Sequence, residues 1–207
     1  MAAQRLDKII ASTGRWSRRE VKDLVRQGRV TVDGVPARSA EEKADPEQAV
    51  IAVNGELLNW RRYTWVMLNK PAGYLSATED GRGATVLDLL SQDLQRQGLF
   101  PVGRLDKDTE GLLLLTNEGG LAHELLSPKK HVDKEYYVRV AGRLTEADSA
   151  AFAEGLHLDD GLICQPAELR VMTSGEESEA HGALRAELQK SLDGLNAPGT
   201  TQQTTPE

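Results

Sequence analysis

The chain has 207 residues, of which 39% are apolar and 28% are charged, as is typical of a folded globular protein. Its one cysteine, Cys164, excludes an internal disulfide and any cysteine-based metal site. No stretch approaches the ~20 apolar residues that span a bilayer, and the N-terminus lacks the apolar core of a signal peptide. We therefore expect a cytoplasmic protein without a membrane partner.

The net charge of −7 is unevenly distributed along the chain. Residues 1–70 contain 13 Lys and Arg against 9 Asp and Glu, whereas the remainder contains 12 against 23. A basic N-terminal part in an acidic protein indicates where a polyanion such as RNA would bind.

Two short helices are predicted at the N-terminus. Apolar residues recur at helical spacing over residues 5–13. The second helix is expected to begin after Ser17, because Ser17 and Glu20 have the spacing of a capping box, and to end at Gly28. Two short strands should follow, with tight turns at Asp33-Gly34 and Asn54-Gly55.

Cations crowd this N-terminal region, and three of them recur every four residues on one side of the second helix. Such a row can follow a phosphate backbone. The alternative is a solvated basic face that binds nothing. The candidate RNA-binding residues are Arg5, Lys8, Arg15, Arg18, Arg19, Lys22, Arg26 and Arg29.

A basic, aromatic segment at residues 59–64, NWRRYT, is predicted to be a linker. A short apolar strand over residues 65–68 should follow and end in a turn at Asn69-Lys70-Pro71. Further along, residues 121–126 have the apolar spacing of a helix, and residues 134–140 alternate as a half-buried strand. Residues 145–156 predict an amphipathic helix, and residues 162–171 predict a return to a strand.

The most informative segment is GRLDKDTEGLLLLTNEGG, which begins at Gly103. It places Asp106 in a polar loop directly before the apolar run Leu112 to Leu115, which predicts a buried strand. A loop anchored in this way can hold a reactive carboxylate still. The alternative is that Asp106 and Arg104 are solvated loop charges.

This segment resembles the central signature of the pseudouridine synthases, G-R-L-D-x-x-T-x-G-L-L-L-x-T-x-x-G. The matching residues are Gly103, Arg104, Leu105, Asp106, Thr109, Gly111, Leu112, Leu113, Leu114, Thr116 and Gly119. The N-terminal helices, the Asp-Gly turn and the basic row resemble the S4 RNA-binding domain. The resemblance implies an α+β fold in which a small S4-like domain precedes a catalytic core built on a mixed, mainly antiparallel sheet with flanking helices.

The resemblance also implies the boundaries and the chemistry. We expect an S4-like domain over residues 1–58, a linker over 59–64, a catalytic core over 65–177 and a divergent, partly disordered tail over 178–207. Asp106 would be the catalytic residue, attacking C1′ of the target uridine or removing a proton from C2′, and the sequence leaves both routes open. Arg104 would help to hold the target base out of its stack, and Tyr136 would pack against the uracil. Neither a metal nor a cofactor is expected.

The implied partner is ribosomal RNA, either 16S RNA or a small-subunit assembly intermediate, bound by a monomer. The segments VGRLDKDTEGLLLLTNEG and SPKKHVDKEY are most similar to members that modify uridine 516 of 16S RNA. The resemblance stops near Glu177, so the catalytic core is expected to be incomplete. One alternative is therefore a catalytically impaired protein that keeps the S4 domain and binds RNA. A glycosidase-like pair of Asp106 and Asp108 is disfavoured, because their spacing is local and no sugar-binding aromatics accompany them.

Overall fold

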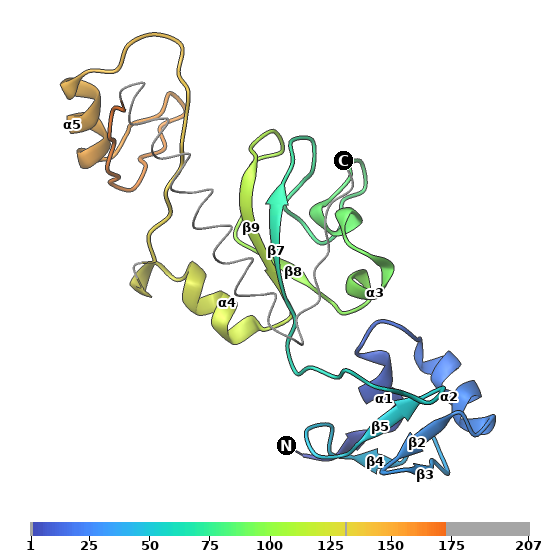
Figure 1. The fold of residues 1–207 in the computed structure, drawn as a ribbon. Coiled ribbons are helices and arrows are strands. Elements are labelled where there is room, and N and C mark those ends of the chain that lie inside the picture. The colour runs from blue at the N-terminus through green and yellow to red at the C-terminus, as the bar shows by residue number, and fades with distance from the viewer. Residues whose placement is uncertain (1, 131, 173–207) are drawn as a thin grey trace. The chain divides into compact units, whose positions relative to one another are not determined.

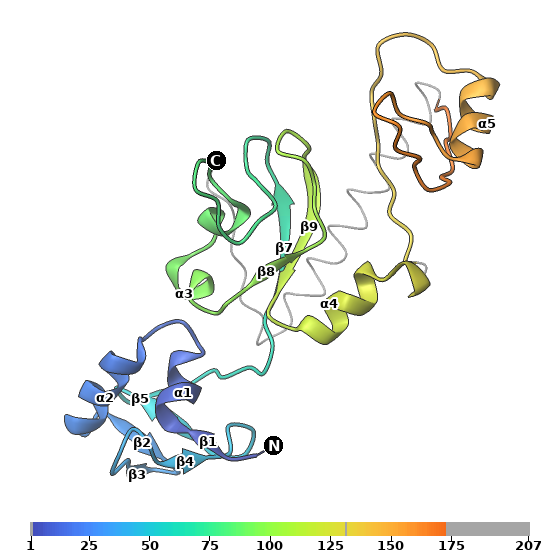
Figure 2. The same cartoon turned by 180° about the vertical axis from the view of Figure 1, so that it is seen from behind.

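A computed structural model describes residues 2–130 and 132–172 of the chain. The chain divides into two compact units, Met1–Lys134 and Glu135–Glu207, which Figure 1 shows from one side and Figure 2 from behind. The expected tail over residues 178–207 lies outside the described residues.

The two N-terminal helices form for the local reasons that the sequence indicates. Helix α1 spans Leu6–Ala11 and helix α2 spans Arg18–Arg26. The capping box is confirmed: the Ser17 amide donates to Glu20 Oε2 at 2.6 Å, and the Glu20 amide donates to Ser17 Oγ at 3.3 Å. Hydrogen bonds from the backbone and the side chain of Ser17 to the Glu20 carboxyl lower the pKa of that carboxyl.

Short antiparallel strands complete this first domain. β2 (Val30–Val32) pairs with β3 (Val35–Pro36) and with β5 (Ile51–Val53), and β5 also pairs with β6 (Glu56–Leu57). β1 (Gln4–Arg5) and β4 (Lys43–Ala44) pair separately. Asp33 and Asn54 have positive φ angles, as do the glycines that follow them, so both predicted tight turns are confirmed.

One hydrophobic core joins these helices and strands. It includes Leu6, Ile9, Ile10, Val21, Leu24, Val25, Val30, Ile51 and Val53, all buried. Helices α1 and α2 lie beside the β2–β5 sheet in both views of the ribbon (Figures 1 and 2). The apolar residues that recur at helical spacing and those that alternate along the strands are therefore buried in the same core.

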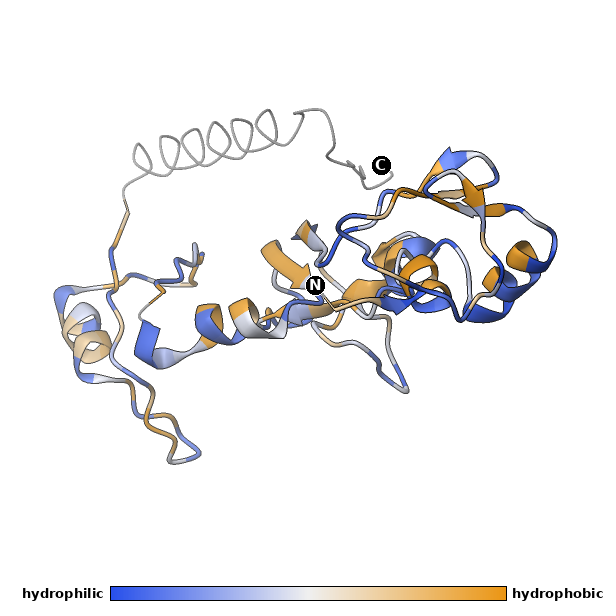
Figure 3. Cartoon of the chain, turned by 90° about the horizontal axis from the view of Figure 1, so that it is seen from below, coloured by the Kyte–Doolittle hydropathy of each residue, from blue (hydrophilic) through white to orange (hydrophobic). Residues whose placement is uncertain are grey.

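The second part of this unit is built on a three-stranded antiparallel sheet with the order β7-β9-β8. β7 spans Trp65–Lys70, β8 spans Phe100–Val102 and β9 spans Gly111–Thr116. Figure 3 colours each residue by its hydropathy and shows apolar strands of the first unit, Met1–Lys134, in orange. The expected strand over residues 65–68 is two residues longer than predicted and ends at Lys70.

Short helical segments flank this sheet in the chain. They are a 3₁₀ turn over Val86–Leu89, α3 (Gln92–Gln95), α4 (Gly119–Leu126) and a 3₁₀ turn over Pro128–Lys130. The buried side chains of Val86, Leu90 and Leu99 pack with Leu68, Leu113 and Leu115 of the strands in a second core. Helix α4 confirms the helix expected over residues 121–126.

The second unit contains α5 (Glu146–Glu154), opened by a capping box between Thr145 and Asp148. Residues 134–140 and 162–171 were expected to be strands, and both expectations are wrong for the described structure, which has no strand in either range and an isolated bridge between His157 and Ile163. Side-chain alternation alone does not make a strand, since the backbone donors and acceptors also need a neighbouring chain.

Candidate active site

Asp106 lies in the loop of residues 103–110, which connects the antiparallel neighbours β8 and β9. Its side chain is exposed to solvent, as are those of Arg104 and Asp108. The loop is short and both of its ends continue into paired strands, so Asp106 projects from a fixed hairpin rather than from a free segment. Gly103 begins the loop with φ of 96°.

Lys70, the last residue of β7, holds this loop from inside. Its side chain is fully buried, and four backbone carbonyl oxygens lie within hydrogen-bond distance of its ammonium group, which shares its three N–H donors among them. Three of these oxygens belong to the loop: Asp106 at 3.0 Å, Lys107 at 2.9 Å and Thr109 at 2.7 Å. The fourth is that of Pro71 at 3.1 Å. A buried charge is costly unless its hydrogen-bonding capacity is used, and here the partners are the backbone of the Asp106 loop.

Two further contacts come from the segment that follows β7. The hydroxyl of Ser76 accepts from the Leu105 amide at 3.0 Å and donates to the Leu105 carbonyl at 2.8 Å. The Gly73 amide donates to the Lys107 carbonyl at 2.8 Å. Together with Lys70, these contacts fasten the backbone on both sides of Asp106, while its carboxylate stays free to meet a substrate.

The roles of Lys70 and Ser76 were missed in the sequence. Residues 68–73, LNKPAG, resemble an L-N-K-P-x-G element that related synthases carry near their active site, with an ordinary tight turn as the alternative, but neither interpretation assigns a contact to Lys70. One sign was present: residues 65–70 alternate, so Lys70 lies on the same face of the strand as Val66 and Leu68, which both belong to the second core. A lysine on the buried face of a strand needs partners inside the protein.

The candidate substrate-binding residues fall in different places. Arg104 lies in the same loop as Asp106, two residues before it. Tyr136 belongs to the second unit, in a segment without strand pairing, and 58% of it is exposed. Within the described part of the chain, no ion pair forms at the Asp106 carboxylate.

The eight candidate RNA-binding residues are all exposed and all belong to the first domain. Helix α2 carries Arg18, Arg19, Lys22 and Arg26. Several cations are already paired with carboxylates. Arg5 contacts Asp7, Arg15 contacts Glu56, Lys22 contacts Glu41 and Arg26 contacts Asp23.

The arrangement offers an exposed carboxylate on a rigid loop. A group of three or more His, Cys, Asp or Glu residues that could hold a metal ion is not found among residues 2–130 and 132–172. In the same residues, every helix is too short or too polar to cross a membrane. A positioned carboxylate can act as a nucleophile or as a general base.

Comparison with known proteins places the chain in a family. The family model described as RNA pseudouridylate synthase matches residues 64–196, and the S4 domain model matches residues 4–50. The first match continues past residue 177, where the resemblance seen in the sequence stopped. The chain belongs to the RNA pseudouridylate synthase family, whose members are isomerases that act on RNA, and it carries an S4 RNA-binding domain.

Individual relatives agree with this assignment. An RNA pseudouridine synthase of Bacillus subtilis is 47% identical over 170 residues, which cover 82% of this chain and 71% of that protein. A ribosomal large subunit pseudouridine synthase B of Vibrio vulnificus is 38% identical over 165 residues, covering 77% of this chain and 51% of that enzyme. A crystal structure of a pseudouridylate synthase is 32% identical, with a TM-score of 0.46 over 82% of this chain and 73% of that one.

Proposed function

We propose that Asp106 is the catalytic residue of an isomerase that converts a uridine of ribosomal RNA into pseudouridine. The observation that carries this proposal is the clamp on the Asp106 loop, in which buried Lys70 donates to three of the loop's carbonyl oxygens. A reactive group that is held in place before the substrate arrives spends less free energy on orientation during the reaction. Asp106 and Asp108 are both exposed carboxylates of this clamped loop, and Asp106 is the one that matches the family signature.

The chemistry needs one ionised carboxylate and no net oxidation. The bond between N1 of uracil and C1′ breaks, the base rotates, and C5 forms a new bond to C1′. C5 then loses its proton, and N1 gains one. Asp106 would start the reaction by attacking C1′ or by removing the C2′ proton, and Arg104 would keep the target base out of its stack. Tyr136 would pack against the uracil and is the candidate for the proton transfer.

For the target we propose uridine 516 of 16S RNA, bound through the S4 domain by a monomer in the cytoplasm. The support is the amino-acid sequence of the Asp106 segment and of residues 127–136, which is most similar to that of members that modify this uridine. A large-subunit uridine is the second candidate, because the Vibrio vulnificus relative is a large-subunit enzyme.

The test is tritium release from transcripts that carry 5-tritiated uridine, since formation of the new C5 bond expels the hydrogen. We expect release from the 16S transcript with the parent chain and none with Asp106→Asn. Release from a 23S transcript alone would support the second target. Tight RNA binding without release from either transcript would support the alternative of a binding protein that lacks catalysis.

A further inference from the structure

A cavity of about 230 Å³ lies beside helix α2 in the first domain. Three cationic side chains, Lys22, Arg26 and Arg38, contribute to its lining, and Val25 and Ala40 form part of its floor. The one acidic residue that lines it is Glu41. Arg38 was not among the RNA-binding residues expected from the sequence, because it lies outside the helices and has no neighbouring cation in the chain.

The wall opposite α2 is a loop that the backbone holds in place. The Leu6 amide donates to the Glu42 carbonyl, and the Asp7 amide donates to the Ala40 carbonyl, both at 2.8 Å. Within the loop, the Glu41 amide donates to Ser39 Oγ at 3.1 Å. The cavity therefore has one wall made of a helix and one made of a loop whose backbone is held by hydrogen bonds, so the backbone positions from which its charged side chains extend are set before a ligand binds.

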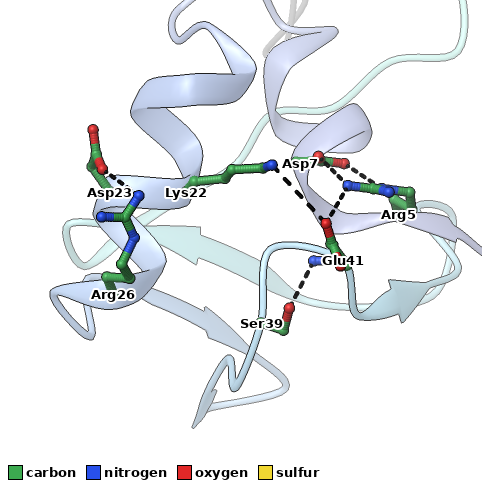
Figure 4. Close-up of polar contacts among 7 residues, drawn as sticks. All are labelled: Arg5, Asp7, Lys22, Asp23, Arg26, Ser39 and Glu41. Atoms are coloured by element: carbon green, nitrogen blue, oxygen red, sulfur yellow. Dashed lines mark hydrogen bonds and ion pairs between the residues drawn. The ribbon is translucent and has the colours of Figure 1, made fainter.

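Figure 4 shows Glu41 between Arg5 and Lys22, whereas Arg26 pairs with Asp23. Glu41 Oε1 lies 3.1 Å from Arg5 Nη2 and 4.0 Å from Lys22 Nζ. The Glu41 side chain is 60% exposed and that of Lys22 is 48% exposed. An exposed pair at such a distance is weak, so a stronger anion can take Lys22 away from it.

We propose that this cavity takes a phosphate group of the RNA backbone, held by Lys22, Arg26 and Arg38, and that Glu41 competes with the phosphate for Lys22. The proposal rests on the proposed function in that its ligand is RNA. A phosphate oxygen suits guanidinium and ammonium donors, and a fixed carboxylate beside them repels it. Glu41 therefore lowers the affinity of the parent protein for RNA.

The first experiment measures the affinity of the full-length chain for a 16S fragment as salt is varied, with Glu41→Gln compared with the parent. Glutamine keeps the shape of the side chain and removes its charge. Glu47→Gln is the matched control, because it removes the same charge from an exposed position of the same domain, outside the cavity. We expect Glu41→Gln to bind roughly threefold to tenfold more tightly at low salt. Screening should shrink this gain as the salt concentration rises.

The second experiment asks whether the gain passes through Lys22. In a double-mutant cycle, Glu41→Gln should raise affinity much less when Lys22 is already Ala. Arg38→Ala should weaken binding and lower the slope of log affinity against log salt by about 0.7 to 0.9, whereas the control Lys43→Ala should leave it unchanged.

Equal gains from Glu41→Gln and Glu47→Gln would overturn the proposal, because they would show a general effect of net charge. A gain that persists in full without Lys22, or equal slopes for Arg38→Ala and Lys43→Ala, would also overturn it. These measurements follow binding alone. Loss of tritium release with the expected binding changes would therefore refute the proposed catalysis and leave the phosphate site standing.

Discussion

The Asp106 loop and the face of helix α2 use positive charge in opposite ways. Lys70 is fully buried and its ammonium group donates hydrogen bonds to backbone carbonyl oxygens, so it fixes the shape of a loop. Lys22 and Arg26 are exposed and have only weak partners in Glu41 and Asp23, so they remain open to exchange. A buried cation with full hydrogen bonding organises a site, whereas an exposed cation with a loose carboxylate partner is available to a ligand.

The sharpest test of the comparison is Asp106→Asn. We expect isomerisation to be abolished and RNA affinity to stay within about twofold of the parent, because phosphate contacts supply most of the binding. Tritium release and a filter-binding titration measure the two properties separately. Asp108→Asn, in the same loop, is the control. Turnover of Asp106→Asn near the parent rate would remove Asp106 from the reaction.

Lys70→Met removes the buried ammonium group and keeps the length of the side chain. We expect the free energy of unfolding to fall by about 3 kcal/mol, because the carbonyl oxygens that accept from Lys70 would stay buried without a hydrogen-bond donor. We also expect kcat to fall on the order of 100-fold as the loop loses its fixed position, with little change in RNA affinity. Denaturant unfolding and tritium release measure these effects. Lys107→Met, on the exposed side of the loop, should leave stability unaltered, and equal losses in the two variants would contradict the clamp.

Replacing Arg18, Lys22 and Arg26 together with Ala tests whether the exposed cations of helix α2 bind RNA. Each lost phosphate contact should lower the slope of log affinity against log salt by roughly 0.7 to 0.9. Stability should change little, because all three side chains are exposed. The matched control replaces Arg82, Lys129 and Lys130, and an equal loss of slope there would show that the row on α2 is an ordinary solvated face.

The smallest effect concerns Asp7, which is buried and accepts from Arg5 Nε at 3.1 Å and from Arg5 Nη2 at 2.8 Å. The hydrogen bond from Arg5 lowers the pKa of the Asp7 carboxyl, although burial acts in the opposite direction. Because the folded pKa is the lower one, this pair stabilises the fold above the ordinary aspartate pKa of about 3.9 and stops doing so as the pH falls through the folded value.

We therefore expect Asp7→Asn to cost about 1–2 kcal/mol of unfolding free energy at pH 7, with the difference from the parent shrinking below pH 4. Unfolding titrations over this pH range measure it. Asp23→Asn is the control, since its pair with Arg26 is exposed, and it should cost no more than about 0.5 kcal/mol. A difference that stays constant to pH 2 would contradict the assignment to Asp7.

Much of the first domain could be predicted because its determinants are local. The capping box at Ser17 and Glu20, the turns at Asp33 and Asn54 and the apolar spacing of α2 each act within a few residues. The strand before Thr116 was predicted for the same reason, because its apolar run is continuous. The strand expected over residues 134–140 failed, since a strand depends on a partner that the segment itself does not encode.

By itself the sequence determined the family, the place of Asp106 in a loop before a buried strand, and the basic row on α2. The tertiary structure decided what holds that loop and what already occupies those cations. Lys70 lies 36 to 39 residues before the carbonyl groups that it binds, and Arg5 lies 36 residues before Glu41. Contacts of this kind follow from how strands and loops pack against one another, and residue spacing along the chain can indicate that Lys70 is buried but does not specify its partners.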